Sequence, residues 1–298
     1  MNDDDVSMYL MPKRRLSSDR EAAIVSLIDD DSPIVRQGLI DELQRMGGIG
    51  IELLTKLSRD KNRLISAQAK ELLDLIKGPD SVAGFVDFIR SQRYELETGC
   101  LLLARTVDNT VDVGEVCIQI DAISARCRDL MIHPSPPFEK CKVLNRVLFH
   151  ENGFRGNTED FADPRNSLLP DVLARRKGIP ITLSILYILV AQRCGLQLEP
   201  VGMPGRFLVG CFQTETPFYI DAFERGGFRT PEDLREIMRA NQISPRPSFL
   251  ARSPVGEVLC RCCRNLTHQY SLQGNHRRAK LFGSFVNEFE ATHRRASS

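Results

Sequence analysis

The sequence lacks an excess of charge of either sign, a long hydrophobic run and a basic leader. Its 40 lysines and arginines balance 39 acidic residues, so the basic domain or stripe of a nucleic-acid-binding protein is missing. The longest apolar-rich run, residues 181–191, is too short to cross a bilayer. The start, MNDDDVSMYL, is acidic where a signal peptide is basic. We therefore expect a cytoplasmic protein without nucleic-acid or membrane partners.

The cysteines show neither a disulfide nor a metal pattern. Nine of them are irregularly spaced, which in a cytosolic protein indicates reduced, mostly buried thiols. Near the C-terminal end, Cys260, Cys262 and Cys263 precede His268 and His276, but their spacing is not the paired C-x-x-C of a zinc site. We predict no metal and no cofactor.

The front of the chain divides into an arm and an internal repeat. Residues 1–17 are polar and charged, and we expect a disordered arm. LIDDDSPIVRQGLIDELQRM (27–46) aligns without gaps with LSRDKNRLISAQAKELLDLI (57–76). In each copy a polar turn precedes a helix with apolar residues at helical spacing. This pattern in residues 18–78 resembles HEAT-type helical repeats, although an unrelated four-helix cap fits nearly as well. The apolar positions are Ile34, Val35, Leu39 and Leu43, and Leu64, Ile65, Ala69 and Leu73.

Beyond Gly78-Pro79 the pattern is that of a helix-rich α+β domain with a small antiparallel sheet. The helix at 180–193 is apolar nearly all round, so we expect it to be central and covered on most sides. Lys177-Gly178 reads as the glycine stop of the helix before it. The other expected helices are 81–91, 95–107, 112–131, 138–150, 167–176 and 231–240, with two antiparallel helices within 255–292; the expected strands are 197–203, 206–213 and 217–222.

Three stretches of this domain carry a family resemblance. NGFRGNTEDFADPRNSLLPDVLARRKGIPITLSILYILVAQRCGL, followed by VGMPGRFLVG and FYIDAF, resembles the SirB1-type proteins of the transglutaminase-like superfamily. The resemblance covers about residues 80–290 and implies a papain-type core, which we assign to residues 79–250. RCCRNLTHQYSLQGNHRRA resembles the tetratricopeptide-like helix pair with which the family ends, so we assign residues 251–298 to such a pair with a basic tail.

The resemblance implies the position of a catalytic triad. Active members place a cysteine at the start of the central helix, where the helix dipole favours the thiolate. A histidine on a following strand and an aspartate on the next complete the triad. Here the helix start, Gly178-Ile179-Pro180-Ile181, holds no cysteine, and the family's Pro-Gly-His-Phe motif reads Pro204-Gly205-Arg206-Phe207. Only Asp221 matches, and an arginine cannot act as a base near neutral pH.

No other cysteine is well placed to substitute. Cys194 lies at the far end of the helix, about 20 Å from its start, at the negative pole that raises a thiol pKa. Cys211 is five residues past Arg206 on one strand and faces the opposite side of the sheet. The sequence favours a pseudoenzyme, and a cysteine hydrolase or transferase with a rebuilt site stays as the alternative.

The remaining site residues have structural and functional interpretations. We expect Arg206 and Asp221 to form an ion pair; the alternative is that Arg206 and the helix start bind a carboxylate or phosphate. The family-motif positions Asn166, Ser167, Arg175, Arg176, Gly205 and Phe207 are predicted to be structural. Asn166-Ser167 reads as a helix cap, and Arg175 and Arg176 as partners of their own helix end.

The function that follows is binding rather than catalysis. Helical repeats expose extended surfaces suited to other proteins, so we predict a scaffold for a protein or peptide. Structural support inside a larger complex stays open as a third possibility, because the fold alone does not determine function.

Overall fold

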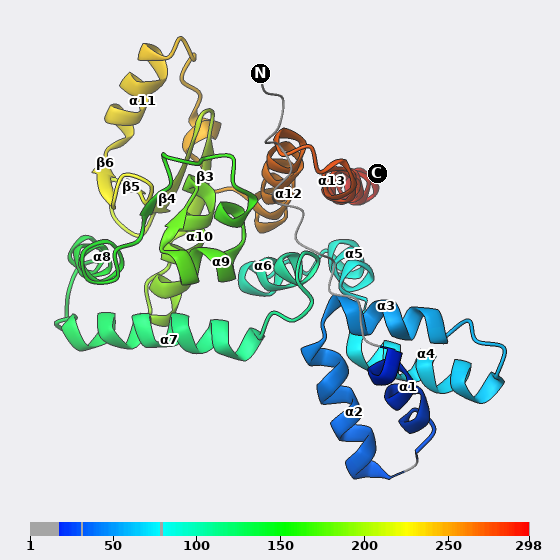
Figure 1. The fold of residues 1–298 in the computed structure, drawn as a ribbon. Helices are drawn as coiled ribbons and strands as arrows, with labels where there is room; N and C mark the ends of the chain where they lie inside the picture. Colours follow the sequence, from blue (N-terminus) through cyan, green and yellow to red (C-terminus); the bar gives the residue numbers. More distant parts are fainter. Residues whose placement is uncertain (1–17, 31, 78–79, 298) are drawn as a thin grey trace, which may run out of the picture. The chain divides into compact units, whose positions relative to one another are not determined.

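The computed structural model describes residues 18–30, 32–77 and 80–297, and its elements are labelled in Figure 1. The predicted disordered arm, residues 1–17, and the Gly78-Pro79 boundary lie outside the described residues. The chain forms two compact units that meet after Asp80, and each is described by itself.

The first unit is built from two helix pairs. Helices α1 (Ser18–Leu27) and α2 (Pro33–Arg45) are followed by α3 (Gly48–Leu57) and α4 (Arg63–Lys77). Both members of the second pair begin 30 residues after their counterparts, which is the offset of the sequence repeat. Leu39 and Leu43 of α2 and Ala69 and Leu73 of α4 are buried, as their spacing predicts. Ile34 and Leu64, by contrast, are exposed although the pattern assigns them to the buried face.

The second unit is an α+β fold, as predicted, with far more helix than strand. Most expected helices are present within two or three residues of their predicted ends, because long periodic segments are a strong local signal. A π-helical turn, η1, prolongs one of them. The helical elements are α5 (Ser81–Ser91), α6 (Leu96–Arg105), α7 (Val113–Leu130), α8 (Pro137–Asn145), η1 (Arg146–Glu151), η2 (Pro164–Ser167), α9 (Leu169–Arg175), α10 (Pro180–Arg193), α11 (Pro231–Ala240), η3 (Pro247–Leu250), α12 (Val255–Leu272) and α13 (His276–Ser297).

The main sheet is a four-stranded antiparallel meander. Strands β3 (Glu199–Met203), β4 (Arg206–Cys211), β5 (Phe218–Asp221) and β6 (Gly227–Arg229) lie in that order. The first three are the expected strands, whereas β6 and the two-residue parallel pair β1 (Arg155–Gly156) and β2 (Lys177–Gly178) are too short to show a pattern. A two-residue turn joins β3 to β4, and its Gly205 adopts φ +73°, a conformation that glycine adopts without strain.

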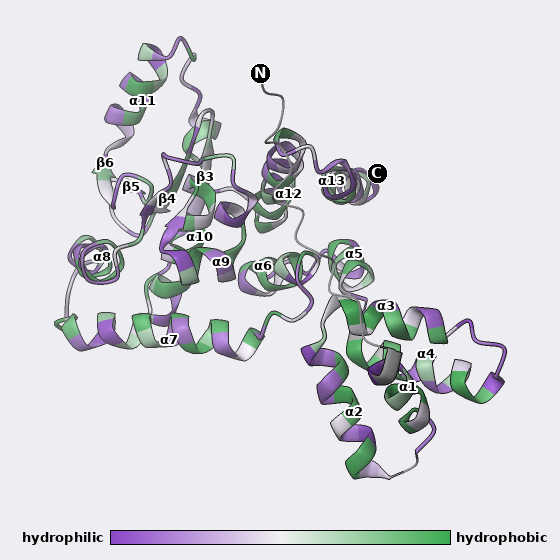
Figure 2. Cartoon of the chain, in the orientation of Figure 1, coloured by the Kyte–Doolittle hydropathy of each residue, from purple (hydrophilic) through white to green (hydrophobic). Residues whose placement is uncertain are grey.

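Helix α10 is the centre of this unit. All residues from Ile181 to Ala191 are buried, as the lack of a polar face predicts. The helix packs against α7 on one side and against β4 on another. Figure 2 shows α7 as alternating apolar and polar segments, and its Val116, Ile120 and Cys127 are buried.

The predicted glycine stop before α10 is wrong. The residue that ends α9 in the left-handed conformation is Arg176, with φ 58°, and its guanidinium lies 4.6 Å from the centre of the Phe154 ring. Gly178 is instead part of β2. A Cβ atom there would come within 3.2 Å of the side chains of Val172 and Leu183, so close packing rather than a turn favours glycine at this position.

The two C-terminal helices share the core of the second unit. Helix α12 packs along α13, and its Leu259, Cys263 and Leu266 belong to the same buried cluster as α10. Residues 251–298 are thus part of one compact unit with the sheet. None of the helices in the described ranges has both the length and the apolar character needed to cross a membrane.

Candidate functional site

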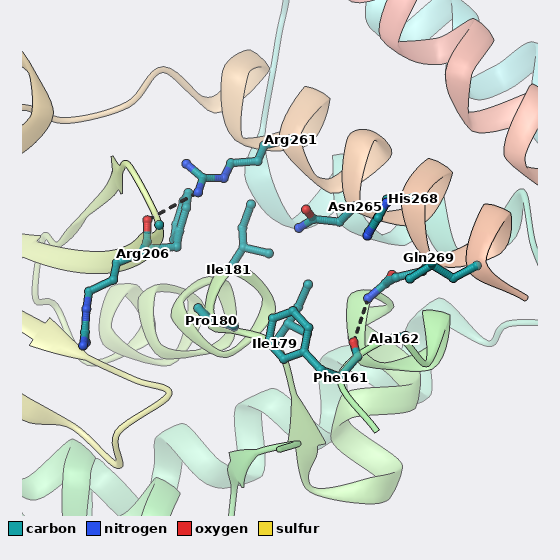
Figure 3. Close-up of a pocket in the computed structure, with 13 residues that line it drawn as sticks. Phe161, Ala162, Ile179, Pro180, Ile181, Arg206, Arg261, Asn265, His268 and Gln269 are labelled. Carbon is teal, nitrogen blue, oxygen red and sulfur yellow. Dashed lines mark hydrogen bonds between the residues drawn. The ribbon is translucent and has the colours of Figure 1, made fainter. Parts of the chain in front are cut away.

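The start of α10, the head of β4 and one face of α12 together enclose a cavity of about 230 Å³. Ile179, Pro180 and Ile181 line it from α10, and residues 205–207 line it from the β3–β4 turn and β4. Figure 3 shows the opposite wall, which α12 and the loop before α9 provide. The sequence predicts the first two parts of this site; the wall from α12 comes from a distant part of the chain.

Arg206 forms the ion pair with Asp221 that the sequence predicts. Its Nη1 lies 2.7 Å from Oδ2 of Asp221 and 3.0 Å from Oε1 of Glu224. The Asp221 carboxylate also accepts the backbone N–H groups of Phe223 and Glu224, each at 3.2 Å. Within the described residues, the Asp221 carboxylate is therefore held by one arginine and two backbone amides.

The charges of this pair suit a structural contact better than proton transfer. Burial raises the pKa of Asp221, and the Glu224 amide and the Arg206 charge offset this in part. Burial lowers the pKa of Arg206, but Glu224 and Asp221 outweigh it, so the pKa is raised above that of a free guanidinium. Arg206 therefore stays protonated at every physiological pH.

The anion-binding alternative for Arg206 has little support from this geometry. Figure 3 shows its side chain running away from Ile179 and Pro180, so that the guanidinium ends apart from the other side chains of the cavity. Both of its carboxylate partners are already within hydrogen-bond distance. An anion would have to displace them to reach this residue.

Two backbone N–H groups at the start of α10 have no protein acceptor in the part of the chain that the structure describes. The Ile179 N–H donates to the Asn166 carbonyl at 3.3 Å, but among the described residues no protein acceptor takes the N–H of Ile181 or Thr182. Ile179 is the N-cap residue and offers no capping side chain. These free amides carry the partial positive charge of a helix N-terminus.

A residue that the sequence analysis missed, Arg261 of α12, also lines the cavity. Its Nη2 donates a long hydrogen bond of 3.4 Å to the Arg206 carbonyl, and its guanidinium lies 5.4 Å from the centre of the Phe207 ring. Burial lowers its pKa. The available signal was the polar stripe along α12, in which Asn265, His268 and Gln269 follow at helical spacing and face the cavity.

The predicted cap at Asn166-Ser167 is wrong. The N-cap of α9 is Leu168, and no side chain caps that helix. Ser167 is buried and donates its hydroxyl to Oε1 of Gln269 at 2.7 Å, while the Gln269 amide donates to the Phe161 carbonyl at 3.3 Å. These bonds fasten the loop before α9 to α12, and the loop thereby becomes a wall of the cavity.

Asn166 and Arg175 brace the same loop from inside. The Asn166 amide donates to the Asp160 carbonyl at 2.7 Å and its Oδ1 accepts from Asn157 at 3.0 Å. Arg175 forms an ion pair with the buried Asp163 at 2.9 Å. The Arg175 side chain therefore braces this loop rather than its own helix end. Arg176 does end α9, because it is the C-cap and its N–H donates to the Val172 carbonyl at 2.8 Å, while its side chain stacks on Phe154.

None of the nine free cysteines lines this cavity. Burial raises the pKa of Cys141 and of Cys262 to about 12. Cys194 departs from our expectation, because its contact with Cys127 lowers its pKa where the helix pole alone predicts a rise. It is nevertheless buried at the far end of α10. The described ranges contain no group of three histidine, cysteine or acidic side chains placed to hold a metal.

The core of the second unit matches a known protein family. A family model described as "transglutaminase-like superfamily" matches residues 114–264, which include α10, the four-stranded sheet and Arg261. The chain is 36% identical over 138 residues to a UPF0162 protein of Xylella fastidiosa, over 44% of this chain and 49% of the relative. A UPF0162 protein of Pseudomonas aeruginosa is 32% identical over 46% of this chain and 50% of its own length.

A third relative is much longer than the shared region. F-box only protein 21 of Mus musculus is 41% identical over 104 residues, which are 32% of this chain and 17% of that protein. The chain thus spans about half the length of the bacterial relatives and less of the mouse protein. No solved structure gives a significant match.

Proposed function

Because this chain belongs to the transglutaminase-like superfamily, we propose that it uses the superfamily's core as a non-catalytic scaffold that binds a protein or peptide. One observation carries the proposal: Arg206 stands where the motif would place a histidine and is ion-paired with Asp221. A general base must lose its proton near neutral pH, and a guanidinium does not. The helix start, residues 178–181, supplies no thiol.

The state of the thiols supports the same proposal. The nucleophile of a cysteine enzyme is the thiolate, which forms in an electropositive and accessible site. Here burial raises the pKa of Cys100 and Cys263 well above that of a free thiol. The alternative, a cysteine hydrolase or transferase with a rebuilt site, depends on Cys194, whose pKa is lowered but which lies buried at the opposite end of α10 from the cavity.

The relation to longer proteins supports a binding module. The region similar to mouse F-box only protein 21 makes up 17% of that protein, which is typical of a domain placed within a larger chain. The proposal includes the SirB1-type assignment and the HEAT-like and tetratricopeptide-like ends. It also includes a cytoplasmic location, because all nine cysteines are free.

Peptide display against the full chain tests the proposal. Random peptides are displayed in two formats, one with a free chain end and one with the random segment inside a longer chain. Enriched peptides are then synthesised and incubated with the protein in the presence of glycine methyl ester. We expect saturable binding and recovery of each peptide with unchanged mass. A peptide that returns hydrolysed, deamidated or coupled to the amine would support the enzyme alternative, and enrichment of no peptide in any format would contradict the scaffold proposal.

A further inference from the structure

A second cavity, hereafter the α13 cavity, lies within the second unit and has a volume of about 700 Å³. The start of α5, the end of α6 and the first turns of α13 line it (Figure 1). This volume falls in the range of about 300–1,000 Å³ that is typical of ligand pockets. Three of its side chains, Arg277, Arg278 and Lys280, are cations, and among the described residues that line it none is acidic. The α13 cavity therefore carries a net positive charge.

The three cations differ in how the protein holds them. Arg278 donates to the Tyr270 hydroxyl at 2.9 Å and to the Val107 carbonyl at 3.3 Å, and its guanidinium lies 5.3 Å from the centre of the Tyr270 ring. Arg277 and Lys280 are exposed. Across the described residues, no carboxylate oxygen lies within 4.0 Å of any of the three charged groups. Arg277 and Lys280 are therefore available to a ligand, and Arg278 is a fixed charge beside them.

The position of these cations does not stabilise the fold. All three lie near the start of α13, which has no acidic residue in its first turn. The helix dipole places a partial positive charge at this end of the helix and disfavours cations there. Arg277 and Lys280, three residues apart on the helix, also repel each other. Side chains that lower the stability of the free protein are typical of functional sites, and a bound anion would offset both effects.

The two available cations belong to one stripe on α13. Four lining residues follow at spacings of three and four and therefore share one face of the helix: Arg277, Lys280, Leu281 and Ser284. The Cβ atoms of Arg277 and Lys280 are about 5–6 Å apart at this spacing, and an extended peptide places alternate side chains about 6.6 Å apart on one face. Val82 of α5 and Leu281 add an apolar wall. Carboxylates on alternate residues of an extended chain can therefore each meet one cation.

An acidic peptide fits these features better than a nucleic acid does. Sites for single strands combine cations with aromatic side chains on which the bases stack, and no aromatic side chain lines the α13 cavity among the described residues. The formal net charge of the chain is only +1, without the basic domain of a nucleic-acid-binding protein. Asn275 adds an uncharged donor, because its Oδ1 accepts the Arg278 N–H at 3.1 Å and its side-chain N–H groups can donate to a peptide.

We propose that the α13 cavity binds an acidic segment of a protein partner in an extended conformation, with Arg277 and Lys280 in contact with two of its carboxylates. Arg278 adds a fixed positive charge beside them. Charge complementarity carries the inference, because the described residues supply no counter-charge to these cations. The inference rests on the proposed scaffold function and assigns one partner contact to α13. The cavity at the start of α10 shares no lining residue with this one in the described ranges.

Fluorescence anisotropy with a designed pair of probes tests this contact. The acidic probe is a fluorescein-labelled peptide of sequence Gly-Glu-Thr-Glu-Thr-Glu-Gly with an amidated end, in which threonine favours an extended chain. The neutral probe carries the same label and glutamine in place of each glutamate. We expect the full chain to bind the acidic probe about tenfold more tightly than the neutral one. The difference should decrease as salt is added, because salt screens exposed charges.

Charge-matched variants locate the contact on the protein. Arg277→Gln and Lys280→Gln should each weaken binding of the acidic probe about threefold, and about tenfold together, because each cation meets a different carboxylate. The control combines Arg93→Gln with Arg252→Gln, two exposed arginines outside the α13 cavity that have no carboxylate within 4.0 Å among the described residues. This control removes the same charge and should leave the affinity unchanged. Thermal unfolding is a second readout: Arg277→Gln should leave the unfolding temperature unchanged or raise it, because this cation opposes the helix dipole.

Several outcomes would overturn the inference. Equal affinity for the two probes, or an equal loss in the control variant, would show that the α13 cavity does not hold the carboxylates. A lower unfolding temperature for Arg277→Gln would show that this cation serves the fold. Tighter binding of oligouridylate than of the acidic probe would show a nucleic-acid site, and displacement of the probe by inorganic phosphate at the probe's own concentration would show a site for small anions. If the acidic probe fails to bind while peptide display still enriches binders, this inference fails and the proposed scaffold function stands.

Discussion

Replacement of Arg206 by methionine leaves the Asp221 carboxylate buried without its cation. The aspartate side chain is 4% exposed and the arginine side chain 34% exposed, with 2.7 Å between their charged atoms. Loss of one partner of a fully buried pair costs about 3–5 kcal/mol, and solvent screening at Arg206 reduces this figure. We therefore expect Arg206→Met to lower the free energy of unfolding by about 2 kcal/mol at neutral pH.

The loss of stability should increase with pH. Burial already raises the pKa of Asp221, and without Arg206 that pKa rises further. A carboxyl whose folded-state pKa exceeds the unfolded value of about 3.9 stabilises the fold below that value, and the stabilisation disappears as the pH rises through the folded-state pKa. The difference between wild type and Arg206→Met should thus be smaller at about pH 5 than at about pH 8.

Urea unfolding at both pH values, followed by far-UV circular dichroism because the chain has no tryptophan, measures this difference. Amide hydrogen exchange of residues 206–221 assigns the change to the sheet. Arg146→Met is the matched control, since Arg146 is 61% exposed and pairs with Glu151 at 2.9 Å; its loss should stay below about 1 kcal/mol. A loss for Arg206→Met that equals the control, or one that does not change with pH, would refute the reasoning.

Three further predictions concern the thiols and the cavity wall. Iodoacetamide labelling of the native protein, resolved by site between about pH 5 and 9 around the free-thiol pKa of about 8.5, should be slow at every cysteine. The pKa is raised at all of them except Cys194, and Cys194, whose pKa is lowered, is buried away from the reagent; one rapidly labelled site would contradict this. Because the pKa values of Cys141 and Cys262 are raised to about 12, stability is fully present below about pH 8.5 and falls above it as the pH approaches the folded-state values; the urea midpoint should therefore decrease between about pH 8 and 10.5, and a constant midpoint would argue against buried thiols. Ser167→Ala removes the 2.7 Å hydrogen bond to Gln269 and should lower the free energy of unfolding, measured in urea, by about 1–2 kcal/mol. An unchanged free energy of unfolding would contradict this prediction and would show that water replaces the lost hydroxyl.

Local pattern alone determined a large part of this fold. Helix α10 is evident because residues 181–191 offer no polar face and Pro180 fits a first helical turn. The turn at Pro204-Gly205 follows from the conformational freedom of glycine. The positions of Arg206 and Asp221 on neighbouring strands, and hence their ion pair, follow from strands that are adjacent in sequence. These features depend on residues close together in the chain.

Tertiary packing decided the composition of the cavity. Arg261 reaches the Arg206 carbonyl across 55 positions of the chain, and Ser167 reaches Gln269 across 102. No local pattern distinguishes a Ser167 that caps a helix from one that bonds to a distant glutamine, because both roles use the same hydroxyl. The pattern did not reveal that Ile34 is exposed, because periodicity identifies a face of a helix, whereas burial depends on whether other elements cover that face. The sequence therefore determined the residues at the start of α10 and the pairing of Arg206 with Asp221, and only the packing of α12 decided that Arg261 lines the cavity.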